Sequence, residues 1–156
     1  MGFSITGFII AAVIFAPNLL FIKFPPKNAP EGLKDAGIVF VVLERAGQAG
    51  CLVLLSILKD NFNGLTLNVW FVLMIICIIA YYCLWIRYIL VGRTFALLFQ
   101  PLAGIPVPMA IFPVLAFAFA ALLGRSVCLG VAVIILAMGH FANSWHTYKQ
   151  LKSNGK

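Results

Sequence analysis

Hydrophobic residues run along this chain in five long stretches, separated by short segments that contain charged residues, proline and glycine. The stretches cover residues 2–22, 36–58, 66–90, 104–123 and 126–146. Each is about as long as the 20-residue helix that crosses a hydrocarbon core about 30 Å thick. The pattern therefore predicts an all-α, polytopic membrane helix bundle with five transmembrane helices, forming one integral membrane domain over residues 1–156.

The composition agrees with lipid as the solvent. Apolar residues make up 63% of the chain and charged residues 10%, and the mean hydropathy is +1.09. Soluble domains have about 45–50% apolar and about 25% charged residues, so a soluble globular domain is excluded. The formal charge of +7 then indicates membrane topology, and we expect membrane lipids rather than nucleic acid as partners.

The distribution of basic residues predicts the orientation. Eight of them fall on the side of the first loop, the third loop and the C-terminus, and two fall on the other side. The positive-inside rule places the N-terminus outside and the C-terminus in the cytoplasm of a plasma membrane of bacterial type. We interpret the first stretch as an uncleaved span, because no basic residue precedes it and no small-residue cleavage pattern follows it. The eight basic residues are Lys23, Lys27, Lys34, Arg87, Arg93, Lys149, Lys152 and Lys156.

The fourth stretch is the least regular, because Pro106, Pro108 and Pro113 interrupt it. Prolines occur in membrane helices when neighbouring groups satisfy the freed carbonyls. The apolar segment 94–102 before it is too short to cross. Four spans plus a re-entrant or interfacial segment are therefore the alternative to five spans.

Small residues four positions apart predict where helices approach closely. The pairs are Gly7 with Ala11, Ala46 with Gly50, Gly47 with Cys51, and Ala116 with Ala120.

Polar residues inside the hydrophobic stretches identify a candidate site, since ionisable groups at that depth usually face a bundle interior or a water-filled cavity. Several of them lie at a similar distance from the midpoints of their helices, in the half of the bundle expected to face the cytoplasm. We expect them to line a polar, ligand-binding cavity there. These residues are Asn18, Glu44, Arg45, Gln48, Tyr81, His140, Asn143 and Ser144.

Their spacing predicts which of them face one another. Glu44 and Gln48 share a helix face, while Arg45 is turned about 100° away. His140 begins a polar stripe at i, i+3, i+4 and i+7 that ends at Thr147. Glu44 is the only acidic residue in any span, so it pairs with Arg45 or with His140.

A pairing with His140 would leave Arg45 without a carboxylate. A guanidinium in a cavity suits a carboxylate or phosphate, so we expect a small anionic ligand. Arg87 and Arg93 are expected to contact lipid head groups. A purely structural role for Glu44 and Arg45 remains the alternative.

Other chemistries lack their signatures. The two histidines are six residues apart, about 240° around one helix, so they cannot form a paired metal site. No nucleophile elbow or phosphate-binding glycine loop is present, and we expect no metal and no cofactor. Three hypotheses follow. The first is a protein that binds a polar solute, as a transporter, transporter subunit or sensor. The second is an intramembrane enzyme that uses Glu44 and His140 on a lipid or prenyl substrate, and the third is an accessory subunit without a ligand.

The orientation can be tested by single-cysteine labelling of intact cells in a background without native thiols. Asn63→Cys should react with an impermeant reagent and Lys152→Cys should be protected. The reverse pattern would refute the orientation, and equal protection of both positions would refute five spans.

Overall fold

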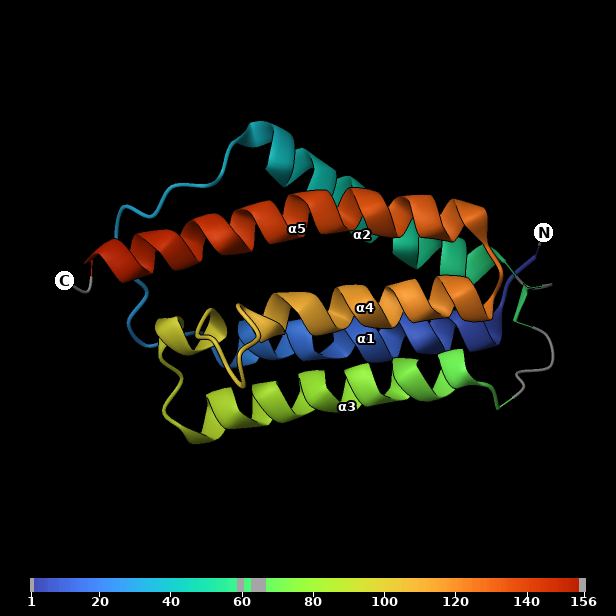
Figure 1. Cartoon of the computed structure of the whole chain (residues 1–156), viewed down its shortest axis with the longest axis horizontal. Coiled ribbons are helices and arrows are strands. Elements are labelled where there is room, and N and C mark those ends of the chain that lie inside the picture. Colours follow the sequence, from blue (N-terminus) through green and yellow to red (C-terminus); the bar gives the residue numbers. More distant parts are fainter. Residues whose placement is uncertain (1, 59–60, 63–66, 155–156) are drawn as a thin grey trace.

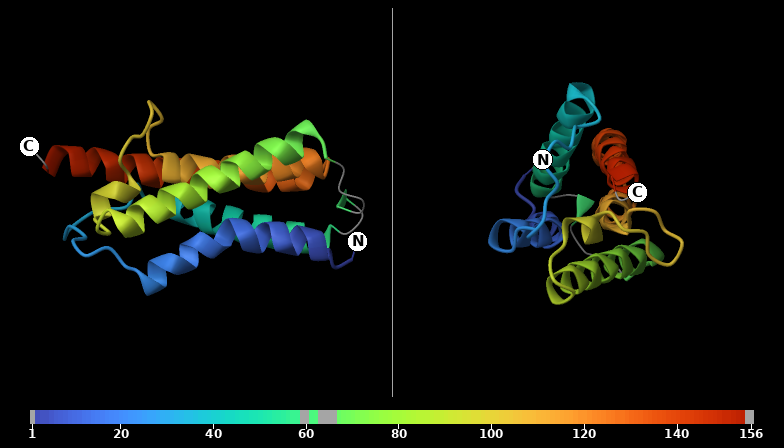
Figure 2. Two further views of the ribbon diagram at one scale, coloured as in Figure 1. Left: turned by 90° about the horizontal axis from the view of Figure 1, so that it is seen from below. Right: turned by 90° about the vertical axis from the view of Figure 1, so that its left-hand side faces the viewer.

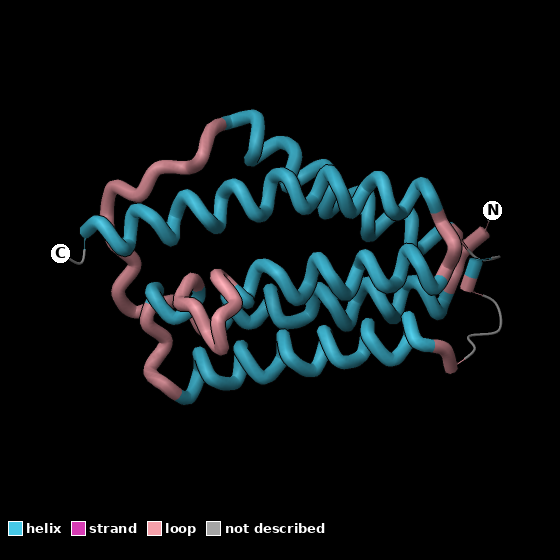
Figure 3. The backbone as a smooth tube through the Cα atoms, viewed as in Figure 1, coloured by secondary structure: helices cyan, strands magenta, loops and turns pink. Residues whose placement is uncertain are grey.

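The computed structural model describes residues 2–58, 61–62 and 67–154. In these ranges the chain is helical and contains no strand (Figures 1 and 3). The predicted all-helical membrane bundle is confirmed. Lys59, Asn63, Thr66 and Lys156 lie outside the described residues. The helices are α1 (Ile5–Lys23), α2 (Ile38–Ile57), α3 (Val69–Leu90), the short 3-10 helix η2 (Phe95–Leu98), α4 (Pro108–Leu123) and α5 (Val127–Asn154).

Polar caps fix two of the helix starts. The Ser4 hydroxyl accepts a hydrogen bond from the Gly7 N–H at the start of α1. The Asn68 side chain accepts one from the Phe71 N–H at the start of α3. Each cap satisfies a backbone donor that has no partner inside the helix.

Four of the helices, α1, α2, α3 and α5, are long and apolar enough to cross a membrane. The fourth expected span is shorter than predicted, because α4 has 16 residues and so a length of about 24 Å. It begins at Pro108, because proline suits the first position of a helix, and Val107 before it has a left-handed conformation. The expected interfacial segment 94–102 contains η2, which packs on the end of α3 and buries Leu98.

The helices form two closely packed pairs. α2 packs on α5, and α3 packs on α4. α1 contacts α2, α3 and α4 and so joins the two pairs (Figures 1 and 2). The half of the bundle nearer the N-terminus is filled by buried apolar side chains, whose fully buried members include Cys51, Leu55, Met74 and Leu129.

Two glycines bring the backbones of α2 and α5 together. A Cβ atom at Gly139 would overlap the backbone of Glu44 and the carbonyl of Phe40, and one at Gly47 would overlap the backbone of Leu136. The prediction of a close approach at Gly47 and Cys51 is confirmed, since both are buried. Ala46, from the neighbouring predicted pair, is exposed.

A proline in α1 creates a contact with α3. Pro17 has no N–H to donate to the carbonyl of Val13. The Tyr82 hydroxyl donates to that carbonyl instead, at 2.9 Å. A polar group from the neighbouring helix thus restores the hydrogen bond that proline removes.

The first loop, the third loop and the end of α5 come together at one end of the bundle. The Lys27 N–H donates to the Arg93 carbonyl at 3.0 Å, and the Gln150 amide donates to the Lys34 carbonyl at 2.7 Å. At the other end, the Asn61 amide donates to the Gly124 carbonyl at 2.7 Å. The first loop, the third loop and the end of α5, which the charge pattern assigned to one side of the membrane, therefore lie at the same end of the bundle.

The glycine contact can be tested by a matched pair of substitutions in α5. Gly139→Ala should destabilise the purified protein by about 1–3 kcal/mol, because the added methyl group overlaps the α2 backbone. Gly130→Ala meets nothing within 4 Å, and it should stabilise by up to about 1 kcal/mol through helix propensity. Thermal unfolding in detergent measures both, and equal melting temperatures would contradict the close approach at Gly139.

Candidate functional site: an intramembrane cavity beside Glu44 and His140

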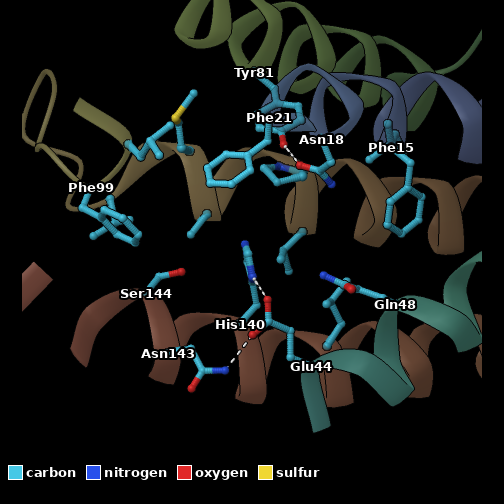
Figure 4. Close-up of a pocket in the computed structure, with 18 of the residues that line it drawn as sticks. Phe15, Asn18, Phe21, Glu44, Gln48, Tyr81, Phe99, His140, Asn143 and Ser144 are labelled. Carbon is cyan, nitrogen blue, oxygen red and sulfur yellow. Dashed lines mark hydrogen bonds and ion pairs between the residues drawn. The ribbon is translucent and has the colours of Figure 1, made fainter. Parts of the chain in front are cut away.

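A cavity of about 270 Å³ lies between the α2–α5 pair and the other helices, in the half of the bundle nearer the C-terminus (Figure 4). Side chains from all five α-helices and from η2 line it. Seven of the eight ligand-binding residues expected from the sequence are among them. These are Asn18, Glu44, Gln48, Tyr81, His140, Asn143 and Ser144.

Glu44 is held by two partners on α5. Its Oε1 lies 2.7 Å from Nδ1 of His140, and its Oε2 accepts a hydrogen bond of 2.6 Å from the Asn143 amide. His140 and Asn143 are three residues apart, so they lie on the same face of the helix. Of the two partners that the sequence allowed for Glu44, the structure selects His140.

The other ring nitrogen of His140, Nε2, points into the cavity (Figure 4). With Nδ1–H donating to the carboxylate, a neutral His140 presents a lone pair on Nε2, and a protonated His140 presents an N–H. The side chains of His140 and Glu44 retain 24% and 20% exposure, so both remain accessible. The pair therefore offers the cavity one exchangeable proton, on Nε2 of His140.

The opposite wall carries a second polar group of residues. The Tyr81 hydroxyl donates to Oδ1 of Asn18 at 2.7 Å. The indole N–H of Trp85 is buried without a hydrogen-bond partner among the described residues. Buried tryptophans usually have such a partner, and this N–H is itself enclosed by protein, so Trp85 lines the cavity with its ring and not with its N–H.

Trp85 is not among the site residues predicted from the sequence. It lies four residues after Tyr81 and therefore shares its helix face. That spacing could have placed it in the cavity.

Aromatic rings form much of the remaining lining. Besides Tyr81 and Trp85, the cavity is lined by Phe15, Phe21, Phe99 and Phe117. Apolar walls with a few polar groups are typical of small-molecule sites.

The backbone is strained where α4 meets the cavity. Val107 lines the cavity and has φ of 46°, a left-handed conformation that is rare for a β-branched residue. Such strain often occurs at functional sites, where the surrounding structure maintains it.

The three arginines named from the sequence all lie outside the cavity lining. Arg45 is exposed and does not line the cavity, because it is turned about 100° from Glu44 around α2. Arg87 donates to the Gln100 side chain at 3.1 Å. The Arg93 guanidinium lies 5.8 Å from the ring centre of Phe24. Neither Arg87 nor Arg93 is part of the cavity wall.

Within the described residues, no three metal-ligating side chains gather at one place. No protein-family profile, curated protein or solved structure matches the chain. The function is therefore argued from the cavity itself.

A double-mutant cycle can measure the interaction between Glu44 and His140. The single changes Glu44→Gln and His140→Gln should each destabilise the protein, and the double change should cost less than their sum. Contacting polar pairs have coupling energies of about 0.5–3 kcal/mol. Chemical unfolding in detergent provides the measurement, and additive effects would show that the two side chains are not coupled.

Proposed function

We propose that this multi-pass membrane protein binds a polar small molecule or a lipid head group in the cavity beside Glu44 and His140, as a transporter, transporter subunit or sensor. The observation that carries the proposal is a preformed cavity with an accessible ion pair on one wall and the exposed amide of Asn18 on the other. A ligand that spans the cavity can reach both. We further propose that the C-terminal end of the bundle faces the cytoplasm of a plasma membrane.

The kind of ligand depends on which charges line the cavity. The anionic ligand expected from the sequence relied on Arg45, and that side chain lies outside the lining. The proposal therefore keeps a polar ligand and does not use a guanidinium to hold it.

An intramembrane enzyme is the second candidate. The contact of 2.7 Å between Glu44 and His140 favours it, because a carboxylate that orients a histidine is a common arrangement for a general base. Arg45, Arg87 and Arg93, which could hold the phosphate of a lipid or prenyl substrate, do not line the cavity, however. Binding without chemistry is therefore the first proposal.

A melting screen with a cavity-filling variant tests the proposed function. Purified protein is heated with small amines, alcohols, carboxylates, phosphates and lipid head groups. A ligand at about 100 times its Kd stabilises the folded state by about 2.7 kcal/mol. Ala110 is buried in the cavity wall, so Ala110→Leu should abolish the stabilisation by any active compound.

Ala12→Leu is the matched control, because Ala12 is an exposed residue on α1 that does not line the cavity. It should respond to ligands as the wild type does. Stabilisation that survives Ala110→Leu would place the ligand elsewhere. A wild type that responds to no compound would favour an accessory subunit without a ligand.

A further inference from the structure

We infer that the ligand of this cavity is a small organic cation, and that its binding displaces the proton on Nε2 of His140. The inference rests on the proposed function and specifies the chemical class of the ligand. It follows from the charges, hydrogen bonds and aromatic rings that surround the cavity.

The charge inventory of the lining is short. Among the described residues that line it, Glu44 is the only acidic one, His140 is the only basic one, and none is a lysine or arginine. With His140 protonated, the pair is neutral overall and joined at 2.7 Å. Charges removed from water are stable only when they are balanced, so a charged ligand has to be compensated inside the cavity.

A cation and an anion require opposite compensation. When a cation binds, neutrality is restored if His140 loses one proton. Nδ1–H can still donate to Glu44, so the hydrogen bond between them is preserved. When an anion binds, neutrality requires protonation of Glu44, which removes the carboxylate that balances the imidazolium. The pair therefore accommodates a cation without loss of its own contact.

The proton that is displaced leaves from Nε2 of His140. Nε2 of His140 is the ring nitrogen that faces the cavity (Figure 4). One positive charge enters on the ligand and one leaves as a proton, so the charge of the site is unchanged.

Among the described residues that line the cavity, only Glu44 and His140 are charged; Arg45, next to Glu44 along α2, is exposed and lies outside the lining. Glu44 of α2 is the charged neighbour of His140. Tyr81 of α3 is titratable, but its hydroxyl is hydrogen-bonded to Asn18 of α1. The lining residues from α4 and η2 are apolar, and they include Val114, Phe117 and Leu98.

The aromatic lining also favours a cation. Six rings line the cavity, from Phe15, Phe21, Tyr81, Trp85, Phe99 and Phe117. The faces of aromatic rings carry negative charge density and attract ammonium groups. A cavity of about 270 Å³ is near the lower end of the range of about 300–1,000 Å³ for small-molecule sites, which suits a cation with one ring.

Calorimetry with three probes of similar size tests the inference. They are 2-phenylethylammonium, the neutral 2-phenylethanol and the anionic 3-phenylpropanoate. Titrations in two buffers with different ionisation enthalpies, at several pH values from about 5 to about 8, give the number of protons exchanged. We expect the ammonium to bind at least about tenfold more tightly than the other two and to release close to one proton at the acidic end.

The pH dependence has a definite sign. The cation and the proton compete, so the Kd of the ammonium should fall as the pH rises through the range in which His140 loses its proton. The slope should approach tenfold per pH unit while His140 is mostly protonated. It should vanish at the alkaline end, together with proton release.

Two variants separate the roles of the pair. Glu44→Gln removes the carboxylate and should weaken ammonium binding at least about tenfold, with a smaller effect on 2-phenylethanol. His140→Gln should still bind the ammonium, but without proton release and with no dependence on pH. Glu31→Gln is the control for loss of an acidic residue, because Glu31 is exposed in the first loop, and it should behave as the wild type.

Three results would overturn the inference. They are ammonium binding that is no tighter than that of 2-phenylethanol, ammonium binding without proton release in the wild type, and preferred binding of the carboxylate with proton uptake. If the alcohol or the carboxylate binds and Ala110→Leu abolishes that binding, the proposed function stands and only the cation is refuted. If no compound binds the wild type in calorimetry and none stabilises it in the melting screen, the proposed function and the cation inference both fail.

Discussion

The close approach of α2 and α5 at Gly47 and Gly139 is the constraint on which the site depends. Without side chains at these two positions, the backbones lie against each other. His140 directly follows Gly139, and the backbone of Glu44 lies where a Cβ of Gly139 would be. The same contact therefore brings the carboxylate and the imidazole within hydrogen-bond distance. In lipid, where the hydrophobic effect does not drive helices together, such packing contributes much of the association.

The sequence predicts the helices and most of the cavity because both depend on simple periodic patterns. Long apolar stretches specify membrane helices, since backbone groups in hydrocarbon have to be satisfied within the segment. The polar stripe that begins at His140 and the shared face of Glu44 and Gln48 predict where polar side chains meet. Depth along each helix then places residues of α1, α2, α3 and α5 in one layer, and the structure brings them around one cavity.

Other features depend on contacts that periodicity does not contain. The start of α4 is set by backbone conformations around Pro106 and Pro108, so its length could not be obtained from hydropathy. Whether Glu44 pairs with Arg45 or with His140 depends on the rotation of α2 against α5, which the glycines determine. Trp85 differs from these features, because its spacing of four residues from Tyr81 already indicates the helix face that lines the cavity.

The two halves of the bundle are packed differently, and this has a consequence for the passage of a solute. A layer of buried side chains lies between the cavity beside Glu44 and the N-terminal end of the bundle. The layer includes Leu55, Met74 and Leu129. In that layer, Gly7 of α1 packs against the carbonyl of Leu55, which leaves no room for a methyl group between α1 and α2. In this conformation the cavity therefore has no open path through that layer toward the N-terminal end. A passage there would require packed helices to separate, as at the contact of Gly7 with α2.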